Sequence, residues 1–347
     1  MGEADAHRYL QVLKEAESDL KGPKPETWFD RLEQEPDQLQ GALQWFLEHE
    51  DLQRAMELAA LAWRFWMNRG HIDEGRKWLG AMLTTAETTE SSALKAEVLY
   101  GAGTLAFQQR DQQDARVNFE QSLSISRRLK DGQGIVRALT GLARVALRQG
   151  DYPSVRRRAE EALATASSTG NRRDLAGPVH LLAAVSRMEK DYPRAREFYQ
   201  ESAELGRSLG DERLVAMEII NLGSVEFLAE NFDEAAGYYV DGLKKAHALR
   251  NTYLLSPSLI GLGAISAVRG KGGRAATLLA AGQALVEATG GVLDPDDQPL
   301  FDQGVSRAQA ATDEKTFTAA WAEGRAMPLE QVIEYALRVS SAKSGRS

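Results

Sequence analysis

Arginines gather in one stretch of this sequence. Residues 135–158 contain six arginines and one acidic residue, Asp151, whereas the whole chain carries a formal net charge of −8. Guanidinium groups bind carboxylates and phosphates through paired hydrogen bonds. The stretch therefore indicates a surface that could hold an anionic ligand, provided that the fold brings these side chains onto one face.

Short motifs elsewhere resemble catalytic or nucleotide-binding signatures. "GAGTLA" (101–106) matches Gly-x-Gly-x-x-Ala but lacks the preceding strand that dinucleotide sites need, and "GLGAIS" (261–266) repeats it. "RGKGGRAA" (269–276) lacks the Lys-Ser/Thr step of a phosphate loop. Ser92-x-x-Lys95 and Ser340-x-x-Lys343 have no companion Ser-Asp-Asn or Lys-Thr-Gly motif. We expect packing roles or chance matches, and no enzyme.

Composition excludes further classes of site. The chain has no Cys, so it forms no disulfide and no Cys-ligated zinc site, and its five His show no metal-ligand spacing. We expect no metal and no cofactor. The pI near 5.4 argues against direct nucleic-acid binding. The N-terminus is charged from its third residue, and no run approaches the ~18 apolar residues of a membrane span. We expect a cytoplasmic protein without membrane contact.

The elements that must position the arginines repeat with a period of 40 residues. Residues that lie 40 positions apart form columns of similar type. One column consists of turn formers, a second is mostly alanine, and a third, four positions after the alanines, is mostly large residues. A further column of Gly or Ala lies twelve residues before the alanine column. The columns are Asp111, Asp151, Asp191 and Asn231; Gly75, Ala115, Val155, Ala195, Ala235 and Ala275; Leu79, Phe119, Ala159, Tyr199, Tyr239 and Leu279; and Gly103, Ala143, Ala183, Gly223 and Gly263.

This spacing is typical of tetratricopeptide repeats, in which a small residue lets the first helix (A) approach the second (B). The usual repeat is ~34 residues, so we assign the six extra residues to the end of helix B. Those ends fall at Gly or Asn/Asp pairs such as 170–171 and 210–211, which tolerate a left-handed cap. The sequence therefore predicts an all-α, right-handed superhelical solenoid of helical hairpins.

The A helices of such an array line its concave face, the usual binding surface. In the third repeat Leu139, Leu142, Ala143 and Ala146 form the buried stripe, so the arginines fall on the opposite side. Applying the same columns to the neighbouring repeats gives the candidate binding residues: Tyr100, Thr104, Phe107, Arg137, Thr140, Arg144, Arg148, His180, Arg187, Ile220, Ser224 and Phe227.

These residues suggest one ligand with an anionic head near Arg144, Arg148 and Arg187 and an apolar tail toward Phe227. A peptide, an acidic segment of a partner protein and a small acidic or amphipathic metabolite all fit that description. The alternative is that the arginines are solvated or pair with glutamates of neighbouring helices.

The repeats lie between two different ends. We predict capping helices over 1–54, six repeats over 55–294, further capping helices over 295–340 and a disordered tail over 341–347. Four of the six Trp fall in residues 45–79, which we expect to form a packed N-terminal core. A break is expected at "KGPKP" (21–25) and a loop at 290–299.

The ends also carry a family resemblance. "AWRFWMNRGHIDEGRKWLGAML" (62–83), the 40-residue repeats and "FTAAWAEGRAMPLEQVIEYAL" (317–337) together resemble one region of bacterial signal-transduction ATPases with numerous domains. It is the C-terminal tetratricopeptide region, found also in LuxR-type and related transcription regulators. The resemblance covers about Ala4 to Leu337 and implies a sensor arm that binds an inducer or partner, or holds a nucleotide-binding module inactive.

The chain departs from the full plan of that family. It has no Gly-x-x-x-x-Gly-Lys-Ser/Thr loop, and no DNA-binding helix-turn-helix follows Leu337, so we expect an excised sensor region or a stand-alone relative. We predict a non-enzymatic sensor or interaction domain whose partner is a protein, a peptide or the nucleotide-binding module of the same regulator. A passive scaffold without small-molecule input is the alternative.

Overall fold

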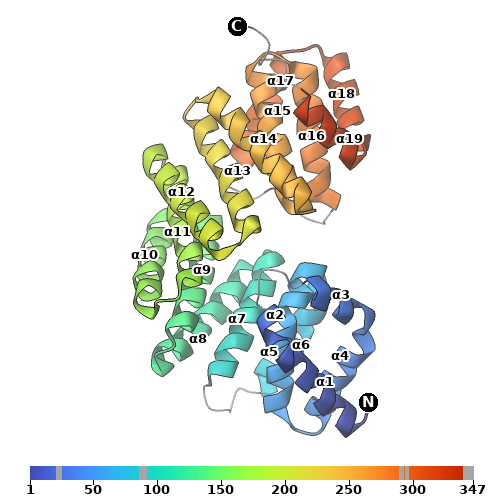
Figure 1. Ribbon diagram of the computed structural model, residues 1–347, viewed down its shortest axis with the longest axis vertical. Helices are drawn as coiled ribbons and strands as arrows, with labels where there is room; N and C mark the ends of the chain where they lie inside the picture. The colour runs from blue at the N-terminus through green and yellow to red at the C-terminus, as the bar shows by residue number, and fades with distance from the viewer. Residues whose placement is uncertain (21–25, 86–91, 289–292, 294–296, 339–347) are drawn as a thin grey trace. The chain divides into compact units, whose positions relative to one another are not determined.

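Helices make up the fold throughout the described part of the chain, and no strand occurs there. The computed structural model describes residues 1–20, 26–85, 92–288, 293 and 297–338 (Figure 1). Within them, no helix is both long enough and apolar enough to cross a bilayer. The all-α prediction is confirmed. The predicted break at 21–25, six of the ten residues of the predicted loop at 290–299 and the predicted tail lie outside the described residues, and residues 298 and 299 of that loop belong to a helix.

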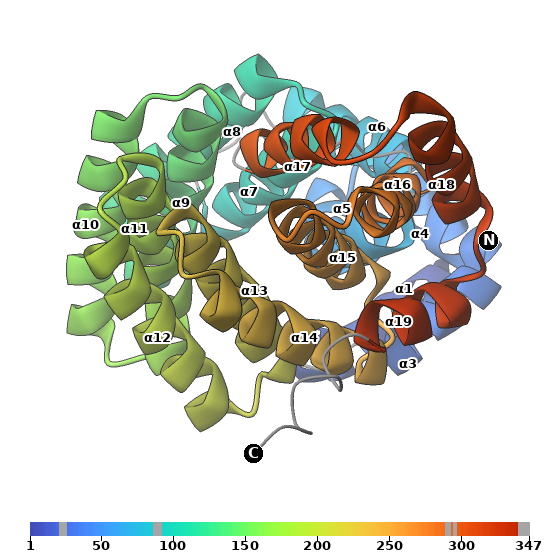
Figure 2. The same cartoon turned by 90° about the horizontal axis from the view of Figure 1, so that it is seen from above.

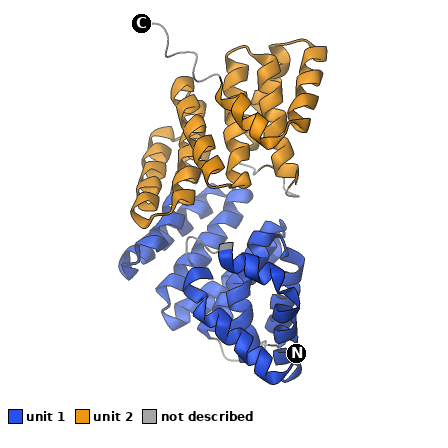
Figure 3. Ribbon diagram, turned by 45° about the vertical axis from the view of Figure 1, so that its right-hand side comes forward, with its two compact units in different colours: residues 1–181 blue, residues 182–347 orange. Residues whose placement is uncertain are grey.

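Residues 1–181 and 182–347 form two compact units (Figure 3). The first contains α1 (Glu3–Glu15), α2 (Glu17–Leu20), α3 (Glu26–Gln34), α4 (Pro36–Glu48), α5 (Leu52–Arg69), α6 (Ile72–Thr85), α7 (Ala93–Gln108), α8 (Gln112–Leu129), α9 (Gly132–Arg148), α10 (Tyr152–Thr169) and a 3-10 turn (Arg172–Leu175). The unit boundary falls within α11 (Ala176–Met188). The second unit continues with α12 (Tyr192–Leu209), α13 (Glu212–Leu228), α14 (Phe232–Ala248), α15 (Thr252–Val268), α16 (Gly272–Ala288), α17 (Gln298–Ala310), α18 (Glu314–Ala326) and α19 (Leu329–Leu337).

The predicted helical pairs are present from α5/α6 to α15/α16, with the A helix first in each pair. The small-residue column lies at the crossings, as predicted. A Cβ placed on Gly103 would lie 2.8 Å from the Phe119 ring, and one on Gly263 would lie 2.8 Å from Leu279. The backbones of the A and B helices can approach this closely only because no side chain intervenes.

The turns between helices share a backbone conformation that the sequence columns predicted only in part. Each described turn from α5 to α16 has a residue in the left-handed region, such as Gly150 (φ 72°) or Lys190 (φ 64°). In most of these turns the next residue caps the following helix: Asp151 and Asp191 each accept a hydrogen bond from the backbone amide three residues on. Six of the left-handed residues among the described positions are not glycine, whereas left-handed caps usually favour glycine.

Helix α11 is shorter than its equivalents and is preceded by the 3-10 turn. Pro178 is its third residue. Because proline lacks an N–H group and is tolerated only in the first turn, the α-helix cannot extend further upstream.

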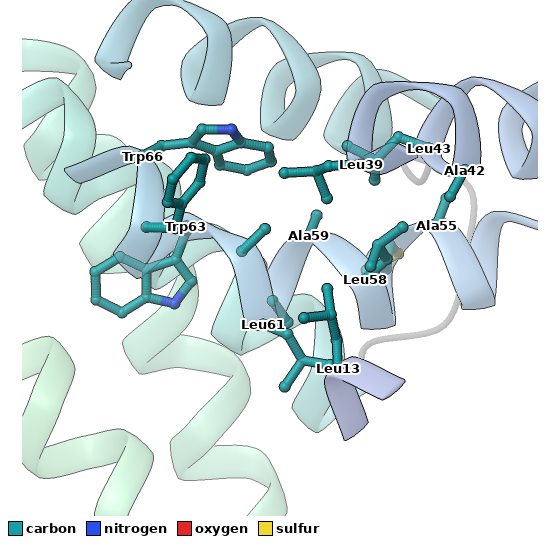
Figure 4. Packing of buried hydrophobic residues seen from close by; sticks show 14 of the residues in the cluster. Leu13, Leu39, Ala42, Leu43, Ala55, Leu58, Ala59, Leu61, Trp63 and Trp66 are labelled. Atoms are coloured by element: carbon teal, nitrogen blue, oxygen red, sulfur yellow. The ribbon is translucent and has the colours of Figure 1, made fainter. Parts of the chain in front are cut away.

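Apolar residues from α1, α4 and α5 pack with the tryptophans in the N-terminal core (Figure 4). Trp63 and Trp66 are buried, and Trp45 and Trp78 pack against the same cluster with part of their surface exposed. The predicted N-terminal core is confirmed. The boundaries at 54/55 and 294/295 stay predictions.

The C-terminal helices depart from the hairpin pattern. Helix α17 packs on α15 and α16, and α18 packs on α16, whereas α17 and α18 make few contacts with each other. Helix α19 lies against α14 and α16 (Figure 2). The end of the second unit is therefore a cap laid over the last repeat and not a seventh hairpin of the same kind.

Candidate functional site

The predicted surface in the first unit is built on three consecutive A helices, α5, α7 and α9. Close packing sets their spacing: a Cβ on Gly101 would lie 2.8 Å from the Trp63 ring, and one on Gly141 would lie 2.8 Å from Phe119. With the helices this close, side chains one repeat apart can contact each other. Position 97 of α7 and position 137 of α9 are one such pair, separated by one 40-residue period.

Glu97 is the centre of a polar row across these helices. Its carboxylate forms an ion pair with Arg137 at 2.5 Å and one with Arg64 at 3.3 Å, and it accepts a hydrogen bond from Trp63 Nε1 at 3.3 Å. The Glu97 side chain is only 11% exposed. Arg137 therefore pairs with a glutamate of the neighbouring helix, which is the alternative that the sequence left open.

Aromatic rings support the same row. The Arg64 guanidinium lies 4.2 Å from the centre of the Trp63 ring, and that of Arg137 lies 5.6 Å from the centre of Tyr100. Trp63 and Tyr100 meet edge to face at 5.6 Å. Cation–π contacts of this kind fix the planes of the guanidinium groups while leaving part of each group in water.

Arg148 has a structural role. It donates a hydrogen bond to the backbone carbonyl of Phe107 at 2.6 Å, and its guanidinium lies 3.6 Å from the centre of the Phe107 ring. Phe107 is in the last turn of α7, where carbonyl groups lack a partner within the helix. A cation at a helix C-terminus is also favoured by the helix dipole, so Arg148 stabilises the end of α7.

Arg144 differs from the other arginines of the predicted surface. It is exposed, and none of the described residues forms an ion pair or hydrogen bond with it. Thr104 and Thr140, by contrast, are buried and donate to carbonyls of their own helices, at Tyr100 and Val136. Among the predicted residues of the first unit, Arg144, Tyr100, Phe107, Arg137, Arg148 and His180 keep exposed surface.

The predicted residues of the second unit are buried. Phe227, only 2% exposed, packs edge to face on Phe232, and Ser224 accepts a hydrogen bond from the Tyr239 hydroxyl at 3.1 Å. Ile220 packs on Gly242 of α14. Placing these three side chains on an open face is therefore wrong, because they face the partner B helix or the turn.

Arg187 is also buried, at 2% exposure, and lies 3.7 Å from the carboxylate of Asp297. Arg144 and Arg148 belong to the first unit, whereas Arg187 and Phe227 belong to the second. A single ligand with its head at Arg144, Arg148 and Arg187 and its tail at Phe227 stays a prediction for Arg144 and Arg148, whereas Arg187 is as deeply buried as Phe227. For Phe227 the burial contradicts it.

The sequence reasoning missed three participants. Arg64 lies 40 residues before Thr104 and 80 residues before Arg144, and so belongs to the same column. Extending that column toward the N-terminus would have found it. Trp63 precedes it in the small-residue column and was assigned only to the core. Asp297 lies outside the repeats, and no repeat column predicts its contact with Arg187.

Two cavities lie away from this row. One of about 420 Å³ lies among α6, α7 and α8, where Arg76 is bound to Asp111 and Asp114 at 2.9 and 2.8 Å. The other, of about 450 Å³, lies between α17 and α18 and is lined by Val305, Phe317 and Trp321. No group of three or more His, Asp or Glu among the described residues could hold a metal ion.

The motifs that resembled catalytic signatures have structural roles where they are described. Gly101 and Gly103 lie inside α7, and Gly261 and Gly263 lie inside α15, at helix crossings. The Ser92 hydroxyl caps α7 by accepting from the Lys95 amide at 3.1 Å. "RGKGGRAA" forms the α15–α16 turn and the start of α16. Ser340 and Lys343 lie outside the described residues.

Part of the repeat region matches a known protein family. Residues 94–168 match the tetratricopeptide repeat family. Together with the 40-residue period and the helical pairs, this match identifies the repeats as tetratricopeptide-like. Among curated proteins, none has a significantly similar sequence.

Solved structures resemble the chain over most of its length. A Rap protein complexed with Competence and Sporulation Factor has a TM-score of 0.61 at 13% identity, covering 97% of this chain and 99% of its own. The Rap conjugation gene regulator of plasmid pLS20, in complex with the Phr* peptide, has 0.54 at 12%, covering 79% and 78%. NprR in complex with its cognate peptide NprX has 0.52 at 16%, covering 89% and 82%. At these identities the likeness establishes a shared solenoid fold.

Proposed function

We propose that this chain is a non-enzymatic sensor or interaction domain that binds an acidic peptide or an acidic segment of a partner protein. The binding surface is the A-helix face of the first unit, formed by Arg64, Tyr100, Arg137, Arg144 and Phe107. The observation that carries the proposal is the charge of this face: it holds four arginines, Arg64, Arg137, Arg144 and Arg148, of which Arg64 and Arg137 are paired with the carboxylate of Glu97.

The chemistry of the face supports an anionic ligand. Arg144 is available to form new ion pairs, and the rings of Tyr100 and Phe107, which contact Arg137 and Arg148, offer apolar contact. Phe107 and Tyr100 both keep exposed surface. Arginine and aromatic residues are the side chains most enriched at the energetic centres of interfaces. Two solved structures of the same fold contain bound peptides, which agrees with this choice of ligand.

The regulated output is part of the same proposal. By its resemblance to signal-transduction ATPases, the chain acts as the cytoplasmic sensor of a transcription regulator or signalling ATPase. Its nucleotide-binding module, or a separate partner protein, responds to ligand binding. Ligand contacts across α5, α7 and α9 favour one spacing of these helices, and a ligand shifts a conformational equilibrium by its difference in affinity for the two states.

Fluorescence polarisation with a library of labelled hexapeptides tests the binding step. One half of the library carries two Asp or Glu residues, and the other half carries Asn or Gln in their place. We expect members of the acidic half to bind and their amide counterparts to bind at least tenfold more weakly. Affinity for the acidic peptides falls as salt rises, because exposed ion pairs are screened.

Two charge reversals locate the site. Arg144→Glu places a repelling charge on the proposed face. We expect it to lower the affinity for acidic peptides at least tenfold. Arg128→Glu is the matched control, since Arg128 is an exposed residue of the B helix α8 and none of the described residues forms an ion pair or hydrogen bond with it. Equal loss in both variants, or no binding of any acidic peptide to the wild type, would contradict the proposal.

A further inference from the structure

Arg187 is an arginine inside the second unit. It lies in the last turn of α11, is 2% exposed and has its guanidinium 3.7 Å from the Asp297 carboxylate. Charged side chains are almost never this deeply buried unless they are paired. A carboxylate at this position is therefore a requirement of the fold and not an incidental contact.

Asp297 is used differently from the other aspartates at helix starts. Asp51, Asp151, Asp191 and Asp313 each cap their own helix by accepting from a backbone amide. Asp297 is the N-cap residue of α17, yet its side chain makes no capping hydrogen bond. Its carboxylate interacts with Arg187 of a distant helix instead, so the first turn of α17 is fastened by an ion pair.

A second buried polar pair responds to the same charges. The Tyr239 hydroxyl donates to Ser224 Oγ at 3.1 Å, and both side chains are buried. Burial raises the pKa of Tyr239, the Ser224 hydrogen bond and the Arg187 charge lower it, and the Asp297 charge raises it further, so the phenol remains neutral. We call the Arg187–Asp297 ion pair the polar spot.

We propose that this spot is a carboxylate-binding site that the chain's own Asp297 occupies, and that an acidic side chain of a bound peptide can replace it. The proposal rests on the proposed function, since it assumes an acidic peptide ligand, and adds a second site and its regulation. An internal carboxylate competes at a high effective concentration. Exchange for an external carboxylate releases the first turn of α17, which couples ligand binding to the C-terminal cap.

The test removes the internal competitor. Asp297→Asn keeps the size of the side chain and removes its charge. The probe is a labelled synthetic peptide with the sequence of residues 293–300, LDPDDQPL, together with a version in which its three Asp are Asn. We expect the acidic peptide to bind Asp297→Asn at least tenfold more tightly than the wild type, and the Asn peptide to bind neither.

Two further variants keep the test decisive. Arg187→Lys in the Asp297→Asn background preserves a cation but loses the guanidinium fork. We expect it to lower the affinity for the acidic peptide at least fivefold. Arg144→Glu in the same background leaves binding unchanged if the peptide occupies the second unit. Loss of binding with Arg144→Glu alone would mean that the peptide uses the first-unit surface, which overturns this inference and leaves the proposed function standing.

Hydrogen exchange supplies a readout that needs no ligand. Amides of the first turns of α17, including those of Phe301 and Gly304, are expected to exchange at least tenfold faster in Asp297→Asn than in the wild type. Asp313→Asn is the control, because it removes the same charge from the N-cap of α18 and should leave exchange in α17 unchanged. Unchanged exchange in α17, or equal peptide affinity of Asp297→Asn and the wild type, would overturn the inference.

Discussion

Glu97 is the side chain on which the arrangement of the first-unit surface depends most. It is mostly buried and receives Arg64, Arg137 and the Trp63 indole. Glu97→Gln keeps the shape but removes the charge that holds two cations. Hydrogen bonds to charged groups contribute about 1.5–3 kcal/mol, so we expect the free energy of unfolding to fall by about 2 kcal/mol.

Urea unfolding at pH 7 measures this change, with Glu160→Gln as the control. Glu160 is an exposed residue of α10, and its substitution should leave the free energy of unfolding within about 0.5 kcal/mol of the wild type. A Glu97 variant as stable as the wild type would mean that the row of charges stabilises nothing.

Glu226 makes the second unit sensitive to acid. Arg196 donates two hydrogen bonds to its carboxylate, at 2.6 and 2.9 Å, and Asn231 donates a third at 2.7 Å. The bonds from Arg196 lower the pKa of Glu226 below its ordinary value of 4.5; burial opposes the shift and the Asn231 bond adds to it. A depressed folded-state pKa stabilises the protein above the unfolded pKa, and this stabilisation is lost as pH falls through the folded value.

Glu226→Gln should therefore cost about 2 kcal/mol of unfolding free energy at pH 7, and this cost should shrink as the pH falls below the ordinary pKa of 4.5. The measurement is urea unfolding at a series of pH values from 7 to 3. Glu201→Gln, an exposed position on α12, serves as the control and should follow the wild-type profile. A constant difference between Glu226→Gln and the wild type at all pH values would contradict the assignment.

The residue types of the site could be predicted from the sequence, but most of their partners could not. The 40-residue columns placed Arg137 and Arg144 on one face. They did not show that Glu97 neutralises Arg137, because a column gives the face and not the direction of each side chain. Ile220 and Phe227 were misassigned because a helix turns 100° per residue. A shift of one position along the helix therefore moves a side chain from the open face to the face that packs on the partner helix.

At the scale of the helices, the close crossings set the geometry of each repeat. Gly261 of α15 lies directly against the ring of Tyr239, which is fully buried and cannot move aside. Gly261→Ala forces a methyl group into that ring. Overpacking of this kind typically costs about 1–3 kcal/mol, so the melting temperature should fall.

Gly237→Ala is the matched control within the same unit. Gly237 is an exposed residue inside α14, and a Cβ there would meet nothing within 4 Å. Because alanine is favoured over glycine in a helix by about 1 kcal/mol, this variant should be more stable than the wild type. Scanning calorimetry of both variants checks the pair; the same sign of change in both would show that the crossing does not depend on glycine.

The periodic part of the fold was largely predictable, and the ends were less so. The helical pairs, their crossings and the extended B helices follow from residues that recur every 40 positions. The left-handed turns at Lys190 and Glu230 were not recognisable, because lysine and glutamate carry no preference for that conformation. The way that α17 and α18 cover α15 and α16 was also unpredicted, since those contacts join a repeat to residues outside the period.

At the scale of the whole molecule, stability should be distributed along the chain. Helix α7 packs on α5, α6, α8 and α9, and α15 packs on α13, α14, α16 and α17, so these repeat helices contact mainly their near neighbours in the sequence. In such arrays the free energy is approximately a sum of local terms and nearest-neighbour interfaces. A cavity in one unit should then loosen that unit first.

Phe119 and Tyr239 allow this to be tested, because they occupy the same repeat column in different units. Phe119 packs on Gly103 and Gly141, and Tyr239 packs on Gly223 and Gly261. Truncation of such a buried aromatic ring typically costs about 3–5 kcal/mol. In Phe119→Ala we expect amides of α7 to α9 to exchange faster while those of α13 to α15 keep their wild-type rates, and the reverse in Tyr239→Ala. Hydrogen exchange followed by mass spectrometry measures both variants. Equal acceleration in both units by either substitution would mean that the chain unfolds as one cooperative body, and a ligand on the first unit would then stabilise the second as strongly as its own.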